Sequence, residues 1–169
     1  MREDRSFEFE SVAFPHAGGL LRYALHLSGE RSRAEDLVQE TLLAAWRSFH
    51  QFQRGTNCKA WLFRILKNLH IRQMQRSLMR AEIPLEINES PLSAPEKISE
   101  GYEVRDAFSH LTPDHREVLR LAIIEGFAIS EIGKILEIPE GTVMSRLNRA
   151  RQALRSRLQK RATAGEGNV

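Results

Sequence analysis

Two stretches of the sequence combine basic side chains with small polar donors, a combination suited to contacting phosphates and base edges. Residues 59–80 hold six Lys or Arg and no acidic residue, and residues 141–162 hold seven and none. Lys and Arg that neutralise phosphates supply most of the sequence-independent affinity for nucleic acid. Arg also pairs with a guanine edge, and Asn with an adenine edge, through two hydrogen bonds at once. We therefore take these stretches as the first candidates for function.

The second stretch separates polar from apolar residues on a helix of about 100° per residue. One face carries Val143, Leu147, Ala150, Leu154 and Leu158, and the opposite face carries Ser145, Asn148, Arg149, Gln152 and Ser156. A second helical pattern at 129–136 and a short turn precede it, and Gly133 would let the two helices approach closely. This is the helix-turn-helix pattern, whose second helix enters the major groove with its N-terminal end. An ordinary antiparallel helix pair with a solvated basic face stays open as an alternative.

The first stretch also has two faces. An exposed side is predicted for Arg64, Lys67, Asn68, Ile71 and Gln75, and an inward side for Trp61, Leu62, Ile65 and Leu69. A basic face beside a polar Gly-Thr-Asn loop and several aromatic residues suits unpaired nucleic acid. An acidic protein or an anionic membrane surface would fit the same charge.

An acidic face is predicted on an earlier helix, with one exposed apolar residue among polar ones. It comprises Asp36, Gln39, Glu40, Leu43 and Arg47. We interpret it as a protein-docking surface, although a face that contacts only water has the same pattern.

The sequence contains no set of residues with the spacing that a catalytic or metal site requires. Cys58 and His70 have no third group to orient them, and His110 and His115 lack zinc-ligand spacing. The phosphate-binding, dinucleotide-binding and zinc-protease motifs do not occur. We expect no enzyme, no metal and no cofactor.

The elements that must position these residues are helices in two blocks. Helical spacing runs from about residue 11 to residue 80 and resumes at 105–161, with almost no strand signals. The intervening residues 81–104 contain three prolines among acidic and polar residues, which predicts a flexible linker. The pattern Thr112-Pro113-Asp114 predicts a helix start. We expect an all-α chain with a domain at 7–80, the linker, and a helix-turn-helix domain at 105–161.

The composition fits a protein of two small domains. The chain has 169 residues, a net charge of +3 and a single cysteine. No apolar run approaches the roughly 18 residues that span a bilayer, and the N-terminus lacks a signal-peptide pattern. We expect a cytoplasmic protein without disulfides. The small net charge conceals +6 at 59–80 and +7 at 141–162, offset by acidic segments that include −5 at 81–106.

Five strings of residues resemble bacterial sigma factors of the extracytoplasmic function (ECF) group. They lie at 34–41 (Ala-Glu-Asp-Leu-Val-Gln-Glu-Thr), 44–46, 55–68, 111–119 and 141–151. The resemblance spans about residues 7–158, with both signatures in the expected order. It implies a sigma-2 domain, a sigma-4 domain and a role as an alternative sigma factor in transcription initiation.

The resemblance also implies roles for individual residues. Docking on core RNA polymerase is expected of Asp36, Leu37, Gln39, Glu40 and Leu43. Binding of the promoter −10 element is expected of Asn57, in the loop that captures a flipped base, and of Lys59, Arg64, Lys67, Asn68 and Arg72. Binding of the −35 element is expected of Thr142, Ser145, Arg146, Asn148 and Arg149.

Two positions depart from the family pattern. Ala128 stands where Ser or Thr often begins the first helix of the motif, which removes an N-cap worth about 1 kcal/mol unless Ser130 caps the helix one turn later. Met144 stands where many members place a basic residue, which removes one expected DNA contact.

The expected partners are core RNA polymerase, promoter DNA and an anti-sigma factor. Two rival functions fit parts of the sequence. A conventional helix-turn-helix regulator would explain only the second block, and an RNA-binding adaptor would explain only the charge. Promoter-dependent transcription with core polymerase separates the three.

Overall fold

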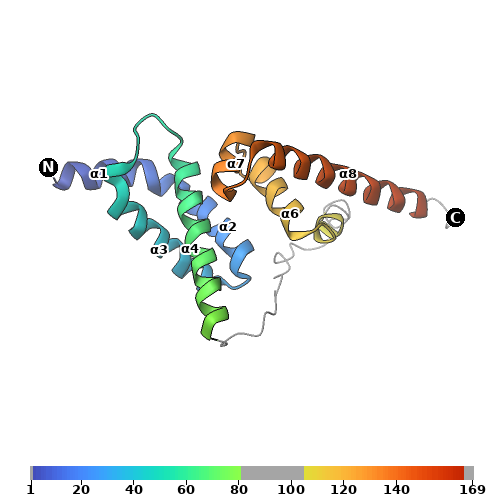
Figure 1. Ribbon diagram of the computed structural model, residues 1–169, viewed down its shortest axis with the longest axis horizontal. Helices are drawn as coiled ribbons and strands as arrows, with labels where there is room; N and C mark the ends of the chain where they lie inside the picture. Colours follow the sequence, from blue (N-terminus) through green and yellow to red (C-terminus); the bar gives the residue numbers. More distant parts are fainter. Residues whose placement is uncertain (1, 81–104, 166–169) are drawn as a thin grey trace. The chain divides into compact units, whose positions relative to one another are not determined.

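The computed structural model describes residues 2–80 and 105–165, and the chain divides into two compact units between Ser93 and Ala94 (Figure 1). The described residues form helices and no strand, which confirms the all-α prediction. The predicted linker at 81–104 lies outside the described residues. None of the described helices is long and apolar enough to cross a membrane.

The first unit is a bundle of four α-helices. In chain order its elements are α1 (Arg2–Ala13), the 3-10 turn η1 (Phe14–His16), α2 (Ala17–Ser28), α3 (Arg31–Ser48), the 3-10 turn η2 (Phe49–Gln51) and α4 (Cys58–Arg80). Tyr23 of α2 stacks on Phe63 of α4 with ring centroids 5.1 Å apart, and both side chains are fully buried. Gly29 ends α2 in the left-handed conformation (φ 71°), so that α3 follows after two residues.

The N-terminal helix begins earlier than the sequence indicated. We expected helices from about Ser11, but α1 starts at Arg2. Its Phe-Glu alternation resembles a strand pattern, yet the two phenylalanines differ: Phe9 is 4% exposed, whereas Phe7 is 76% exposed. Phe9 anchors α1, because the centroid of its ring lies 5.3 Å from that of Trp46 and 5.2 Å from that of Phe49.

In the second unit, three α-helices follow a short helical segment at 105–109. They are α6 (Pro113–Leu119), which continues into a π-helix, η3 (Arg120–Ile124), then α7 (Ile129–Leu136) and α8 (Glu140–Gly165). Thr112 caps α6 because its Oγ1 accepts a hydrogen bond from the His115 amide at 3.3 Å, and Pro113 occupies the first turn. The helix start predicted at Thr112 is confirmed.

The helix-turn-helix prediction is also confirmed. Glu137 ends α7 in the left-handed conformation (φ 55°), and α8 begins three residues later. Gly133 permits the tight turn, since a Cβ atom there would lie 3.0 Å from the carbonyl oxygen of Ile138. The buried residues Val143 and Leu147 of α8 lie on the stripe that the sequence predicted.

Candidate nucleic-acid interface

The first turns of α8 present a polar face to solvent. Ser145, Asn148 and Arg149 are exposed, opposite the buried Val143 and Leu147. The Ser145 hydroxyl donates to the carbonyl oxygen of Thr142 at 3.0 Å, and Thr142 itself is half-buried. A hydroxyl, an amide and a guanidinium side by side can donate to phosphates and to base edges.

Arg146, also predicted to contact DNA, is held within the protein. Its Nη2 lies 2.7 Å from Oδ2 of Asp114, in the first turn of α6, and its side chain is 28% exposed. The ion pair joins α8 to α6. Arg146 therefore supports the helix that carries Ser145 and Arg149, in addition to any contact of its own.

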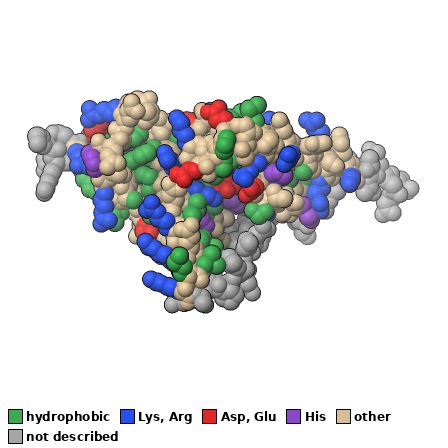
Figure 2. Space-filling view, viewed as in Figure 1, with side chains coloured by type: hydrophobic (Ala, Val, Ile, Leu, Met, Phe, Trp, Pro, Cys, Tyr) green, Lys and Arg blue, Asp and Glu red, His purple; other side chains and the backbone are tan. Residues whose placement is uncertain are grey.

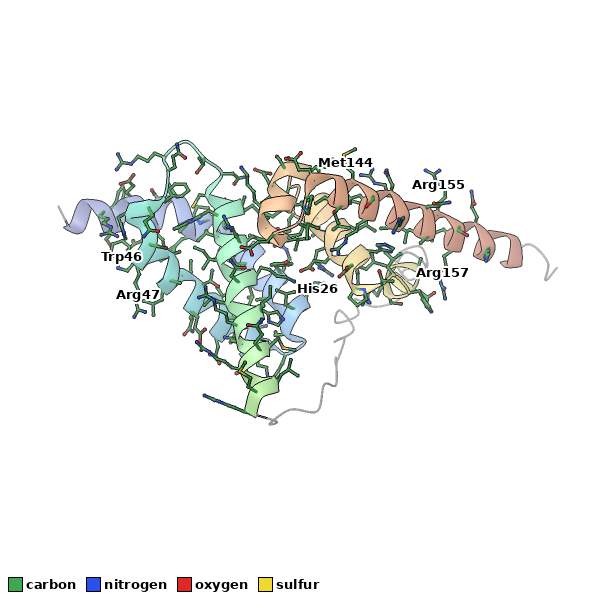
Figure 3. The ribbon with its side chains drawn as sticks, viewed as in Figure 1. His26, Trp46, Arg47, Met144, Arg155 and Arg157 are labelled. Atoms are coloured by element: carbon green, nitrogen blue, oxygen red, sulfur yellow. The ribbon has the colours of Figure 1, made fainter. Side chains whose placement is uncertain are left out.

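Beyond its first turns, α8 carries positive charge on more than one side. Figure 3 shows Arg155 and Arg157 pointing away from opposite sides of the helix. Met144, at the start of α8, is 51% exposed and points outward, so an apolar side chain faces solvent where the family pattern often has a basic one. The exposed polar face at the start of α8 therefore lies on a helix that also carries basic side chains on its other sides.

In the first unit, the long helix α4 carries a second basic surface. Arg64 and Arg72 are exposed, while Lys59, Lys67 and Asn68 are half-buried. The Lys59 ammonium lies 5.5 Å from the ring centroid of Phe63, a cation–π distance. Figure 2 shows Lys and Arg side chains along this helix, which contains no acidic residue. The surface is suited to following a polyanionic backbone.

The loop before α4 is structured at both ends. Phe52 stacks on Phe49 and contacts Trp61, with centroid distances of 5.9 and 5.0 Å. Asn57 caps the N-terminus of α4, since its Oδ1 accepts from the Ala60 amide at 3.3 Å. The predicted base-contacting residue thus also acts as a helix cap, and its side chain is exposed.

A pair that sequence reasoning missed joins this loop to α1. Arg54 donates to the carboxylate of Glu8 through Nε and Nη2, both at 2.7 Å. Glu8 precedes Arg54 by 46 residues. No local pattern signals such a contact.

Two titratable groups near the start of α4 have shifted pKa values. Burial raises the pKa of the Cys58 thiol, which keeps it protonated and therefore weakly nucleophilic. Burial, and secondarily the positive charge of Lys59, lowers the pKa of His16. Folding thus favours neutral His16, whose contribution to stability is present above the ordinary pKa of about 6.5 and is lost as the pH falls below it.

The acidic face predicted on α3 is exposed, whereas Leu37, a docking residue implied by the resemblance, is not. Asp36, Gln39 and Leu43 are exposed, and Leu43 retains 49% exposure among polar neighbours. Glu40 is exposed and accepts a hydrogen bond from Gln73 of α4 at 3.0 Å. Leu37 is 1% exposed and belongs to the core, so it positions the helix and offers no docking surface.

Comparisons with known proteins identify the family. Residues 15–78 match the family model for Sigma-70 region 2, and residues 102–154 match that for Sigma-70, region 4. The chain is 36% identical to the ECF RNA polymerase sigma factor SigL of Mycobacterium tuberculosis over 85% of each protein. It belongs to the ECF sigma factors. This sigma factor is also 38% identical to EcfG of Rhodopseudomonas palustris, over 80% of the chain and 76% of that protein.

Solved structures support the same assignment. The sigma factor RpoE of Bartonella quintana, solved in complex with the anti-sigma factor NepR, is 32% identical, with a TM-score of 0.73 over 90% of this chain and 97% of that one. CnrH, solved with the cytosolic domain of CnrY, is 26% identical, with a TM-score of 0.62 over 90% and 88%. The two units of this sigma factor are thus its sigma-2 and sigma-4 domains. Helix α1 precedes the residues that match region 2.

Proposed function

We propose that this alternative sigma factor binds core RNA polymerase and directs it to promoters through two DNA-reading surfaces. The sigma-4 domain, assigned to 105–161, binds the −35 duplex, and the sigma-2 domain, assigned to 7–80, binds core polymerase and captures the −10 element. Residues 81–104 join the two. The observation that carries the proposal is the exposed polar face at the start of α8.

The −35 contacts come from Ser145, Asn148 and Arg149. These side chains lie at the N-terminal end of the second helix of the motif, which is the end that enters the major groove. The three are exposed on one face. The buried Val143 and the ion pair of Arg146 hold that face in place.

The −10 contacts come from the loop at 52–57 and from α4. Extrusion of a base costs a few kcal/mol of unstacking, which contacts in a pocket and to the backbone must offset. Asn57 contacts the base, and Lys59, Arg64, Lys67, Asn68 and Arg72 follow the unpaired strand. The six basic residues of α4 support this role.

Docking on the polymerase uses the exposed part of the α3 face, and its target is the clamp helices of the largest subunit. Asp36, Gln39, Glu40 and Leu43 supply this surface. An exposed Leu surrounded by polar and acidic side chains combines an apolar anchor with a polar rim, as protein interfaces do.

An anti-sigma factor controls the availability of these surfaces. The two solved relatives were each captured with a partner, one of them named as an anti-sigma factor. The apolar and charged faces that contact polymerase and DNA are exposed in this chain, and one protein ligand can cover them. The sigma factor itself acts by binding, without catalysis, in the cytoplasm where the polymerase works.

Promoter-dependent run-off transcription with purified core polymerase tests the proposal. Arg149→Ala is expected to reduce binding about 10- to 100-fold at particular −35 bases, the loss of one bidentate base contact. Arg157→Ala is the matched control, since this exposed residue lies on another side of α8. A uniform loss over all sequences would make Arg149 a phosphate contact. Duplex binding without core binding or transcription would favour a conventional helix-turn-helix regulator.

A further inference from the structure

The contact between Glu8 and Arg54 has the geometry of a specific ion pair. Two guanidinium nitrogens donate to two different carboxylate oxygens at 2.7 Å each. Bidentate pairing fixes the direction as well as the distance of the two groups. Glu8 lies in α1 and Arg54 near the tip of the loop at 52–57, so the pair connects two separate elements.

The helix that carries Glu8 is itself held firmly. The Arg5 guanidinium lies 5.0 Å above the Trp46 ring and donates to the Trp46 carbonyl oxygen at 3.3 Å. Phe9, next to Glu8, is buried against Trp46 and Phe49. Trp46 lies on α3 in Figure 3. These contacts hold α1 in place, so Glu8 has a fixed position on the surface of the domain.

The loop tip lacks comparable packing. Phe52 and Asn57 anchor its two ends, and Thr56 closes a turn by donating from its amide and hydroxyl to the Gln53 carbonyl oxygen at 3.2 and 2.7 Å. Gly55 (φ 85°) has no described atom within 4 Å of the place where a Cβ would lie, apart from its chain neighbours. An ion pair from Arg54 can therefore decide which tip conformation dominates.

We propose that Glu8 and Arg54 are positioning residues: their ion pair holds the loop in the conformation that captures the −10 base, and so sets base discrimination. The inference rests on the proposed base capture by this loop. The Arg54 side chain is 81% exposed and that of Glu8 35%, so the pair adds little to global stability. An exposed pair of this kind shifts a local conformational equilibrium about 1.5- to fivefold.

Hydrogen exchange of the full-length protein tests the restraint without DNA. Glu8→Gln and Arg54→Gln should each speed exchange of the Thr56 amide, which donates to the Gln53 carbonyl oxygen, about 1.5- to fivefold. The swap Glu8→Arg with Arg54→Glu should restore part of the protection. Glu10→Gln is the matched control, because Glu10 lies on the same helix and accepts only from Ser6 among the contacts described. Equal exchange in Glu8→Gln and Glu10→Gln would overturn the proposal.

Transcription from promoters that differ at the captured base tests the consequence. Glu8→Gln and Arg54→Gln should both lower the ratio of preferred to other bases, while Glu10→Gln leaves it unchanged. If Arg54 instead binds phosphate, Glu8→Gln releases it and strengthens binding whereas Arg54→Gln weakens it, a result that overturns the proposal. A ratio altered by Asn57→Ala but not by Glu8→Gln also overturns it. A ratio unaltered even by Asn57→Ala would show that the proposed base capture itself is wrong.

Discussion

Ala128 occupies the N-cap of α7, where a methyl group accepts no hydrogen bond. Its backbone is extended (φ −68°, ψ 157°), as an N-cap requires, and the Glu131 carboxylate accepts from the Ala128 amide at 2.9 Å. One half of a capping box is therefore present without the other half. Helix α7 therefore lacks one stabilising N-cap hydrogen bond that its backbone geometry would allow.

We predict that Ala128→Ser stabilises the sigma-4 domain by about 1 kcal/mol, because the new hydroxyl can accept from the Glu131 amide. Denaturant unfolding of the whole chain, followed by far-UV circular dichroism, measures the gain. Both tryptophans, Trp46 and Trp61, lie in the sigma-2 domain, so their fluorescence provides an internal reference. Ala153→Ser, inside α8, is the matched control and should destabilise slightly. If the transition measured by fluorescence shifts as much as the transition measured by circular dichroism, the stabilisation is not a local effect of the cap.

At the scale of elements, α4 combines two tasks along its 23 residues. Its first half supplies core residues such as Leu62, Phe63 and Leu66, and its exposed side carries basic residues over the whole length. The far half exposes apolar residues as well, including Ile71 and Leu78. Binding of unpaired DNA by such a helix depends strongly on salt because phosphates release counterions.

We predict that Arg64→Gln and Arg72→Gln each lower the affinity of the holoenzyme for a single-stranded −10 oligonucleotide. Each lost phosphate contact should also reduce the slope of log affinity against log salt by about 0.7. A titration at several salt concentrations measures both quantities. Arg31→Gln removes the same charge from an exposed site on α3 and should leave the slope unchanged. If the salt dependence has the same slope in all three variants, the unpaired DNA does not contact Arg64 or Arg72.

At the scale of the whole molecule, the connection between the domains must match promoter geometry. The 24 residues at 81–104 can reach at most about 80 Å. The −35 and −10 elements lie about two helical turns apart, near 70 Å. The maximum reach of the segment therefore only slightly exceeds the distance between the two promoter elements.

We predict that deletion of about ten of these residues abolishes run-off transcription, since the remainder reaches only about 48 Å. Binding of the −35 duplex should persist because the sigma-4 domain keeps its fold. A Gly/Ser replacement of the original length is the control and should retain transcription if length is the requirement. Undiminished transcription by the shortened chain would refute the length argument.

Features that repeat along one helix could be predicted from the order of the residues. The stripe of Val143, Leu147 and Ala150 and the opposite face of Ser145 and Arg149 follow from the helical period, and the structure confirms that division. The all-α fold, the cap at Thr112 and the close approach at Gly133 were predictable for the same reason, because each depends on residues near one another in the chain.

Contacts between segments far apart in the chain became visible once the folded arrangement of the helices was known. It placed Leu37 in the core, paired Arg146 with Asp114 and joined Glu8 to Arg54. A helical period assigns a side chain to a face, but it cannot say which neighbouring helix covers that face or which charge lies opposite. The packing of the helices therefore determines which residues hold the candidate sites in place. The residue types alone indicate what chemistry those sites can perform.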